Sequence, residues 1–308
     1  EVLDLIAGLQ KEHGTAVALI THDMGVVARM CDRLEVMQYG EVVESGSVGK
    51  IFGAADHPYT RRLLDAMPRI DAGDAPAPMP AETETLLDVD DLRVEFPIRP
   101  ETGFFRKPIP LKAVNGVSFS LAKGETLGIV GESGCGKSTL ARAVLRLIEP
   151  TDGNVSWLGT PLTDLDKRAM KKERKDLQIV FQDPLASLDP RMTIAASIAE
   201  PLKTYRPDMT ARERRAAVGE MMERVGLDPN MQNRYPHEMS GGQNQRVGIA
   251  RAMINRPKLI ICDEAVSALD VSIQAQVINL LEDLREEFEL TYLFIAHDLS
   301  VVHHLCNR

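Results

Sequence analysis

Apolar side chains recur along the chain with two spacings, and one combination of them occurs twice. Residues 1–33 align without gaps to residues 276–308. In each copy, leucines four positions apart predict an amphipathic helix, and a short apolar run before His-Asp predicts a buried strand. The predicted strands are Ala16–Ile20 and Tyr292–Ile295. A pattern repeated over this length indicates a tandem duplication.

The segment after the first copy predicts structure that the second copy lacks. Leu34–Glu44 predicts a β-hairpin that turns at Tyr39-Gly40, and His57–Leu64, HPYTRRLL, predicts a helix. Residues 70–85 are rich in Pro, Ala and acids without periodicity, which is typical of an extended linker. Because the chain opens and stops at equivalent points of the repeat, we expect it to be a piece of a longer protein. The expected domains are residues 1–69, the C-terminal remnant of the first copy; 70–86, the linker; and 87–308, the second copy without its C-terminal end.

Composition narrows the class of protein. The 308 residues are 44% hydrophobic and 26% charged, and the net charge of −9 argues against a protein that binds the nucleic-acid backbone. The basic run Lys167–Lys175 is typical of a solvated helix face. The four cysteines form no C-x-x-C pair, which indicates neither a zinc site nor a disulfide framework and fits a reducing cytosol. No apolar stretch approaches the roughly 20 residues that span a bilayer, so any membrane role is expected to be peripheral.

A glycine-rich loop follows the predicted strand Thr126–Val130 and precedes a helical pattern that continues to Ile148. Its sequence, GESGCGKST, matches G-x-x-x-x-G-K-[ST], the phosphate-binding loop. Backbone N–H groups of such a loop surround phosphates, Lys137 is expected to reach the β- and γ-phosphates, and the Ser138 hydroxyl to ligate Mg²⁺. A glycine turn without a nucleotide is the alternative, which the strand and helix around this loop disfavour. The predicted nucleotide contacts of the loop are Gly131, Glu132, Ser133, Gly134, Cys135, Gly136, Lys137, Ser138 and Thr139.

Two acids end a second apolar run, LIICDEAVSALD at residues 259–270. The run predicts a buried parallel strand that presents carboxylates at its C-terminal end. We expect Asp263 to hold Mg²⁺ and Glu264 to polarise the attacking water as general base. Without the phosphate-binding loop, an ordinary strand followed by an acidic turn would explain the same residues.

Between these motifs lies MSGGQNQRVGIARAM, residues 239–253. A serine and glycines at the start of a helix make a further anion site, and Ser240-Gly241-Gly242-Gln243 resembles the signature of ATP-binding cassettes. The phosphate loop, Gln182 in VFQDP, the signature, Asp263-Glu264, SALD and His297 follow one another in the order of that family. The chain therefore resembles an ATP-binding cassette (ABC) ATPase over nearly its whole length.

The resemblance implies a fold, two cofactors and the hydrolysis of ATP, coupled to transport across a membrane. The fold is α/β, a P-loop NTPase (RecA-like) ABC nucleotide-binding domain with an antiparallel β subdomain near 87–125 and a helical signature subdomain across 190–250. ATP and Mg²⁺ bind between two cassettes, so that the signature of one caps the γ-phosphate held by the other. Gln182 senses Mg²⁺ and the attacking water, and His297 contacts the γ-phosphate. A lone histidine at a strand end is more often structural, but the His-Asp of both copies argues for a functional one.

The sequence departs from the family pattern at some positions. Asn244 replaces the more usual charged residue or glutamine after the signature, and Ala265 replaces a common proline after the acids; neither change removes a catalytic group. An aromatic that stacks on adenine is expected before the phosphate loop. Phe104 and Phe105 are candidates, with an exposed loop aromatic as the alternative. Residues 60–90 hold no cysteine and so give no support for the iron–sulfur cluster of some relatives.

Longer strings resemble one importer subfamily, the peptide, nickel and glutathione uptake group: ITHDMGVV, HPYTRRLL, FPIRP, FQDPLASLDPR, RYPHEMSGGQ and DEAVSALDVSIQAQ. Two fused cassettes resemble the dipeptide or glutathione import ATPases. The implied partners are a second cassette, integral-membrane permease subunits and, indirectly, a substrate-binding protein, with no nucleic acid. The implied place is peripheral, at the cytoplasmic face of the plasma membrane. The cargo stays open between peptides and glutathione, since fold analogy does not select substrates.

Proteins of other classes fit these motifs less well. A soluble ABC ATPase that acts on ribosomes or DNA would share them, but translation-type pairs carry a long charged linker and DNA-repair types carry coiled-coil or zinc insertions. A GTPase would show an N-K-x-D motif, which this sequence lacks. An ABC exporter is disfavoured by the missing fused membrane segment and by the importer strings.

Overall fold

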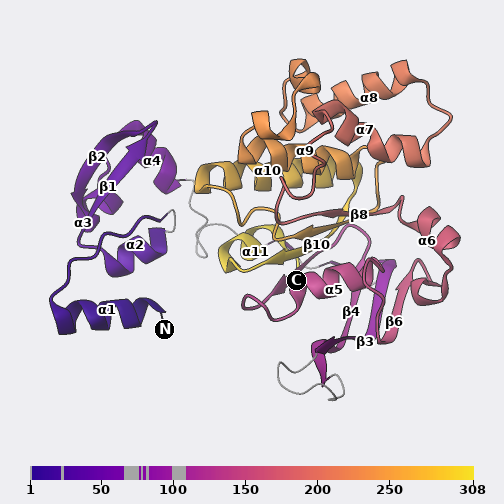
Figure 1. Ribbon diagram of the computed structural model, residues 1–308, viewed down its shortest axis with the longest axis horizontal. Helices are drawn as coiled ribbons and strands as arrows, with labels where there is room; N and C mark the ends of the chain where they lie inside the picture. The colour runs from indigo at the N-terminus through magenta and orange to yellow at the C-terminus, as the bar shows by residue number, and fades with distance from the viewer. Residues whose placement is uncertain (1, 22–23, 66–75, 78, 81–82, 99–108) are drawn as a thin grey trace, which may run out of the picture. The chain divides into compact units, whose positions relative to one another are not determined.

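The computed structural model describes the chain in segments (Figure 1). These are residues 2–21, 24–65, 76–77, 79–80, 83–98 and 109–308. The chain divides into two compact units, Glu1–Met67 with Asp270–Ala275 and Pro68–Leu269 with Gln276–Arg308. Phe104, Phe105 and most of the predicted linker lie outside the described residues. The domain limits at 69 and 86 therefore stay a prediction.

The first unit consists of short helices and a hairpin. Its elements are α1 (Val2–His13), α2 (Met24–Met30), β1 (Arg33–Gln38), β2 (Glu41–Ser47), α3 (Val48–Gly53) and α4 (Pro58–Asp65). β1 and β2 pair antiparallel, and both turn residues have positive φ, 51° at Tyr39 and 83° at Gly40. Two left-handed residues in a two-residue turn match the twist of a hairpin. The predicted hairpin and the predicted helix at 57–64 are confirmed.

The HPYT segment has a structural role within this unit. The Glu44 carboxylate on β2 accepts hydrogen bonds from the backbone N–H groups of Asp56 (2.8 Å) and His57 (3.1 Å), directly before α4. His57 Nδ1 accepts from the N–H of Tyr59 (3.2 Å). Acceptors at a helix start satisfy amides that the helix itself leaves free. The segment therefore begins α4 and ties it to the hairpin.

One predicted element of the first unit is wrong. Residues 15–20, which include the predicted strand Ala16–Ile20, have no regular secondary structure, and Ile20 is 100% exposed. A strand needs hydrogen-bonded neighbours to form. Among the described residues of this unit, β1 and β2 form the one sheet, and they pair with each other. The apolar run thus has no sheet to enter.

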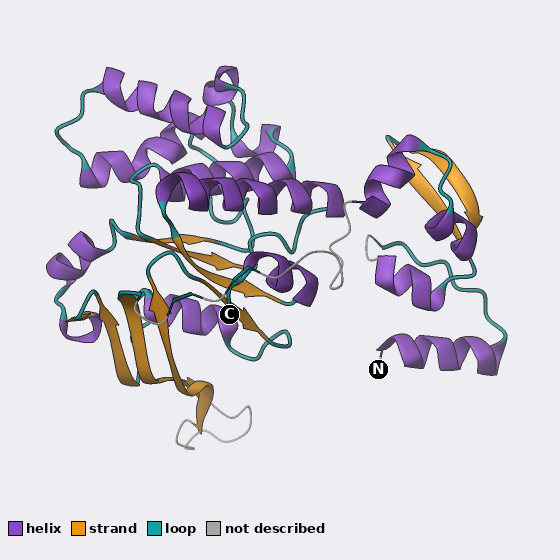
Figure 2. Cartoon of the chain, turned by 180° about the vertical axis from the view of Figure 1, so that it is seen from behind, coloured by secondary structure: helices purple, strands orange, loops and turns teal. Residues whose placement is uncertain are grey.

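A four-stranded parallel sheet lies at the centre of the second unit (Figure 2). Its order is β5 (Thr126–Val130), β10 (Thr291–Ala296), β9 (Leu259–Asp263) and β8 (Leu177–Val180). Every residue of β9 and β10 is buried, as expected for parallel strands covered on both faces. Because all neighbouring pairs are parallel, the carboxyl ends of the four strands lie at one edge.

A second, antiparallel sheet packs next to the first. Its order is β4 (Ile109–Ala122), β3 (Thr85–Ile98), β6 (Asp152–Trp157) and β7 (Thr160–Pro161). The antiparallel portion predicted at 87–125 is confirmed by β3 and β4, while β6 and β7 join it from beyond that range. Buried side chains of both sheets and of α5 (Lys137–Val144) form one core, with Trp157 and Leu87 fully buried. The helix after the glycine-rich loop is therefore fixed between the two sheets.

A helical layer packs against β8, where α9 contacts it (Figure 1). Its elements are α7 (Ile194–Tyr205), α8 (Ala211–Arg224), α9 (Gly241–Met253) and the short turns η2 (Pro229–Asn233) and η3 (Pro236–Glu238). The side chains of Thr193, Thr210 and Ser240 cap α7, α8 and α9 by accepting backbone hydrogen bonds. The helical subdomain predicted across 190–250 is confirmed, and with it the predicted fold class.

The remaining elements complete the second unit and its borders. They are η1 (Leu162–Asp164), α6 (Lys167–Glu173), α10 (Val271–Phe288) and α11 (Leu299–Leu305). Lys167, Lys171 and Lys172 are exposed on α6, as predicted for a solvated face. Within the described parts of the chain, no helix combines the length and the apolar character needed to cross a membrane.

Candidate active site

The predicted catalytic residues gather at the carboxyl edge of the parallel sheet. The glycine-rich loop follows β5, and His297 follows β10. Asp263 ends β9 and Glu264 comes directly after it, while Gln182 follows β8. These strands are neighbours in space although they are far apart in sequence. In open α/β sheets, this edge is where ligands bind.

The backbone of the glycine-rich loop requires glycine at position 136, the last glycine of the loop. Gly136 has a φ of 102° and stands at the start of α5. A Cβ atom there would lie 2.1 Å from the carbonyl oxygen of Ala113 on β4, so any side chain would collide with the neighbouring sheet. Glycine at this point lets the loop pass close to β4 and begin the helix whose amide groups face the loop.

Lys137 turns back over the loop and is almost completely buried. Its Nζ donates to the carbonyl oxygens of Gly131 (2.8 Å) and Glu132 (2.9 Å), and it lies 3.6 Å from Glu264 Oε1. A buried ammonium group needs such partners, because leaving its charge unpaired would be costly. The lysine thus occupies the centre of the loop with donors directed at oxygen atoms.

Ser138 and Asp263 form the next contact. The Ser138 Oγ donates to Asp263 Oδ1 at 2.7 Å, and Asp263 is 1% exposed. Burial raises the pKa of Asp263, against the opposing effects of the Ser138 hydrogen bond and the charge of Arg142. A buried carboxylate beside a hydroxyl oxygen provides the hard oxygen ligands that Mg²⁺ takes. These residues therefore fit a magnesium ion, whose charge would offset the desolvation of the carboxylate.

Glu264 is held in place by its backbone as well as by its side chain. It has a φ of 49°, in the left-handed region that a side-chain-bearing residue rarely adopts, and its N–H donates to Ile295 O at 3.0 Å. Its carboxylate faces Lys137 with Oε1 and accepts from Gln182 Nε2 at 2.8 Å with Oε2. Left-handed backbone at a polar site is a form of strain that clusters at functional positions. The strain here directs a carboxylate at the phosphate loop.

The other predicted loop residues and His297 are placed at the same edge. Glu132, Ser133, Cys135 and His297 are exposed, whereas Thr139 is half-buried in α5. Exposure of this kind leaves the outer side of the loop open to a ligand.

The signature residues lie on a different element. Ser240 caps α9, its Oγ accepting from the N–H of Gln243 (3.3 Å), while Gln243 Oε1 accepts from the N–H of Ser240 (2.9 Å). Gly241 and Gly242 form the first turn of α9. In the described residues, no hydrogen bond joins these four residues to the glycine-rich loop. The structure therefore brings together the loop, Gln182, Asp263 and Glu264, and leaves the signature outside that network.

Arg142 is a neighbour of the site that the sequence analysis missed. It stands on α5, and its charge acts on Asp263. The signal was available, because Arg142 follows Ser138 by four positions and such residues share a helix face.

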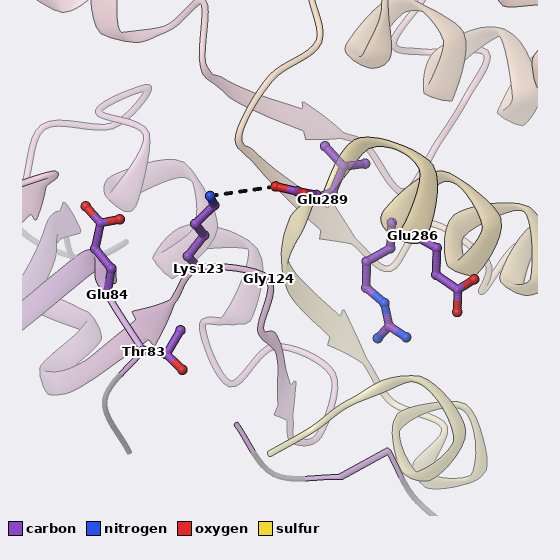
Figure 3. A pocket seen from close by; sticks show the side chains of 8 residues that line it. Thr83, Glu84, Lys123, Gly124, Glu286 and Glu289 are labelled. Carbon is purple, nitrogen blue, oxygen red and sulfur yellow. Dashed lines mark ion pairs between the residues drawn. The ribbon is translucent and has the colours of Figure 1, made fainter. Parts of the chain in front are cut away.

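A cavity of about 390 Å³ lies elsewhere in the second unit (Figure 3). Its lining residues are Thr83, Glu84, Lys123, Gly124, Arg285, Glu286, Glu289 and Leu290. Lys123 Nζ lies 3.7 Å from Glu289 Oε2 across it. Lys123 and Gly124 precede β5, so the cavity is at the amino end of that strand, opposite the glycine-rich loop. It holds none of the predicted site residues.

Comparison with known families matches two parts of the chain. Residues 114–267 match the model described as ABC transporter, and residues 43–89 match the one described as oligopeptide/dipeptide transporter, C-terminal region. The first range includes the glycine-rich loop, Gln182, the signature and the acid pair, and the second includes the HPYT segment. The resemblance inferred from the motifs is confirmed.

Several curated proteins are similar over long stretches. The chain is 46% identical to the glutathione import ATP-binding protein GsiA of Pectobacterium atrosepticum, over 100% of this chain and 53% of that protein. It is 59% identical to the oligopeptide transport ATP-binding protein OppF of Haemophilus influenzae, over 73% of this chain and 68% of that protein. It is 45% identical to the peptidoglycan transport ATP-binding protein YejF of Agrobacterium fabrum, over 100% of this chain and 55% of that protein. The chain thus spans about half the length of GsiA and YejF.

Solved structures support the same assignment. The dimeric structure of MJ0796, a bacterial ABC transporter cassette, has a TM-score of 0.62 and 32% identity, and the match covers 70% of this chain and 90% of that one. A post-hydrolysis state of the same ATP-binding cassette, bound to ADP and Pi, matches equally well. With these motifs, this site geometry and these relatives, the chain belongs to the ATP-binding proteins of ABC transporters.

Proposed function

We propose that this chain binds ATP at the carboxyl edge of its parallel sheet and hydrolyses it to drive an ABC importer. The observation that carries the proposal is the contact network in which Lys137 faces Glu264, Gln182 donates to Glu264, and Ser138 donates to Asp263. Hydroxyl, ammonium and carboxylate groups converge there on one open loop. A glycine turn and an acidic turn that served only the fold would not need a glutamate with strained backbone or an exposed glycine-rich loop.

Each residue has a role in the proposed reaction. Lys137 binds the β- and γ-phosphates once their oxygens replace the Gly131 and Glu132 carbonyls as its acceptors. Glu264 accepts a proton from the attacking water, whose oxygen bonds to the γ-phosphorus as the bond to the β–γ bridging oxygen breaks. The products are ADP and inorganic phosphate. Gln182 orients the Glu264 carboxylate, and His297, exposed after β10, would contact the γ-phosphate.

Ser138 and Asp263 would hold Mg²⁺, with Gln182 nearby as a further ligand. When bound, the ion supplies positive charge that neutralises the phosphate oxygens. The buried carboxylate of Asp263 supports this assignment, because burial raises its pKa more than the Ser138 hydrogen bond and the charges of Arg142 and Lys137 lower it.

The signature completes the site from a second cassette. Ser240, Gly241, Gly242 and Gln243 present a helix start that suits an anion, yet they make no hydrogen bond to the phosphate loop of their own chain in its described part. Head-to-tail pairing of two cassettes would place each signature on the other chain's nucleotide. The dimeric form of the similar cassette MJ0796 supports this arrangement.

Replacing Glu264 with Gln tests the proposed hydrolysis. Glutamine preserves shape and hydrogen bonding but cannot take a proton, so turnover should fall by about 10²- to 10⁴-fold. ATP affinity should stay within about twofold, because the phosphate contacts remain. Steady-state phosphate release and equilibrium binding of a fluorescent ATP analogue measure the two quantities. Glu286→Gln, the same change at an exposed position of α10, is the control, and full activity in Glu264→Gln would remove Glu264 from the reaction.

We further propose peptides or glutathione as the cargo, carried by permease subunits with which the chain works at the cytoplasmic face of the membrane. The names of the relatives GsiA and OppF and the match of residues 43–89 support this class. A soluble ATPase that acts on ribosomes or DNA is the alternative, and none of these relatives favours it. Lys137→Ala in the chromosomal gene should abolish uptake of labelled tripeptides or glutathione and leave uptake of a labelled sugar intact. Unchanged uptake of both peptide classes would redirect the search for cargo.

A further inference from the structure

We propose that Asn244 is a positioning residue that sets the geometry of the signature loop. Asn244 lies in the first turns of α9, directly after Ser240-Gly241-Gly242-Gln243, and is 0% exposed. Its Nδ2 donates to the carbonyl oxygens of Pro236 (2.9 Å) and Met239 (3.4 Å). Pro236 is the first residue of η3, and Met239 is the C-cap residue that follows η3, immediately before Ser240. One buried amide thus fastens the segment before the signature to the helix after it.

The chemistry of this contact needs an amide donor. Two carbonyl oxygens face the same nitrogen, so the side chain must point its NH₂ group at them, and its Oδ1 is left buried without a partner. An apolar residue at this position would remove the side-chain donor from both carbonyls and leave Pro236 O with the backbone N–H of Met239 (3.2 Å). A carboxylate would set a negative charge against both oxygens. Asparagine therefore fits because it donates twice over a short reach.

The position of this contact explains how it would act. The exposed Gly241, in the first turn of α9, can present its backbone N–H group to an anion only when η3 enters α9 at a fixed angle. Asn244 is 0% exposed and therefore lies too deep to touch a nucleotide. It acts through the signature, and this inference rests on the proposed pairing of cassettes.

Because a signature serves the opposite cassette, a defect in it should be repaired by a second chain. We would test Asn244→Asp, which has nearly the same shape but no donor. Alone, this variant should bind a fluorescent ATP analogue within about twofold of wild type and lose at least tenfold in turnover. Mixed in equal amounts with Lys137→Ala, which is inactive because its own loop fails, it should recover activity. Half of randomly formed pairs carry one intact site, so about a quarter of the wild-type rate is expected.

Controls separate this inference from the function on which it rests. Ser240→Ala mixed with Lys137→Ala should recover activity in the same way; if wild type hydrolyses ATP but this mixture stays inactive, the pairing of cassettes is wrong whatever Asn244 does. Asn279→Asp, the same change at an exposed position of α10, should behave as wild type. Asn244→Ser, smaller and neutral, replaces Asn244→Asp if the latter does not fold.

The role of Asn244 is overturned by any of three results. Wild-type turnover in the isolated variant would show that the contact is dispensable. A variant that binds ATP but is not repaired by Lys137→Ala would place its defect outside the signature. Unfolding of both the Asp and the Ser variants would make Asn244 a determinant of folding rather than a positioning residue.

Discussion

The two copies of the repeat have the same sequence pattern and different structures. In residues 276–308, the helical leucines are buried, with Leu280 at 7% and Leu284 at 1% exposure, and the following run forms β10. In residues 1–33, the corresponding Leu5 and Leu9 are 63% and 45% exposed, and the corresponding run forms no strand. Both copies nevertheless form the helix, as α1 and as part of α10.

This difference between the copies distinguishes the helix, which depends on its own segment, from the strand, which depends on neighbouring strands. A helix satisfies its backbone hydrogen bonds within one segment, so the pattern is sufficient to form it in both copies. A parallel strand depends on flanking strands, which β10 finds in β5 and β9. The same apolar residues are thus a core in one setting and exposed surface in the other.

The largest difference between the two copies is expected when a charged residue replaces the isoleucine at the same position of each apolar run. Ile295 is 0% exposed and its repeat counterpart Ile20 is 100% exposed. Ile295→Asp buries a carboxylate without a partner and should destabilise the second unit by more than about 4 kcal/mol, abolishing its cooperative unfolding. Ile20→Asp should change the free energy of unfolding by less than about 0.5 kcal/mol. Urea denaturation followed by circular dichroism measures both.

Two less disruptive substitutions test the same comparison if Ile295→Asp fails to express. Leu284→Ala should cost about 2–5 kcal/mol, since the leucine lies in a packed core. Leu9→Ala should have almost no effect, since the leucine is already half exposed. Equal losses in the two copies would mean that residues 1–33 are buried in solution as deeply as 276–308.

Much of the second unit could be predicted from sequence because its signals are local. The glycine-rich loop, the buried run ending in Asp263-Glu264 and the capped start of α9 each depend on neighbouring residues. Whether residues 16–20 form a strand could not be predicted in this way, because a strand also needs hydrogen-bonded partner strands from elsewhere in the chain. The contact of Gln182 with Glu264 likewise joins two strand ends 82 positions apart. The left-handed backbone of Glu264 could not be predicted either, because glutamate rarely adopts this conformation.

The repeat also gives a matched test of catalysis. His297 follows β10 beside the phosphate loop, while its counterpart His22 lies outside the described residues. His297→Ala should lower ATP turnover on the order of 10²-fold, the usual loss when one donor to a transition-state oxygen is removed. His22→Ala should leave turnover unchanged, because the phosphate loop of this chain belongs to the other copy. Comparable losses in both would assign His-Asp a structural role.

The smallest expected difference concerns the repeated cysteine and alkaline pH. Burial raises the pKa of Cys306 from 9.0 to about 12, whereas its counterpart Cys31 is half-buried. The unfolded chain then loses this proton at a lower pH than the folded chain. The stability linked to Cys306 is therefore complete below pH 9 and falls as pH rises toward 12, by about 1 kcal/mol at pH 10. Cys306→Ala should remove that part of the loss between pH 7 and 10, and Cys31→Ala should not. Cys306 also raises the pKa of the neighbouring Cys262, so Cys306→Ala changes the alkaline pH dependence through both thiols, whereas Cys31→Ala leaves both in place. An identical pH profile for the two variants, measured by urea denaturation, would mean that Cys306 is not kept from water in the folded chain.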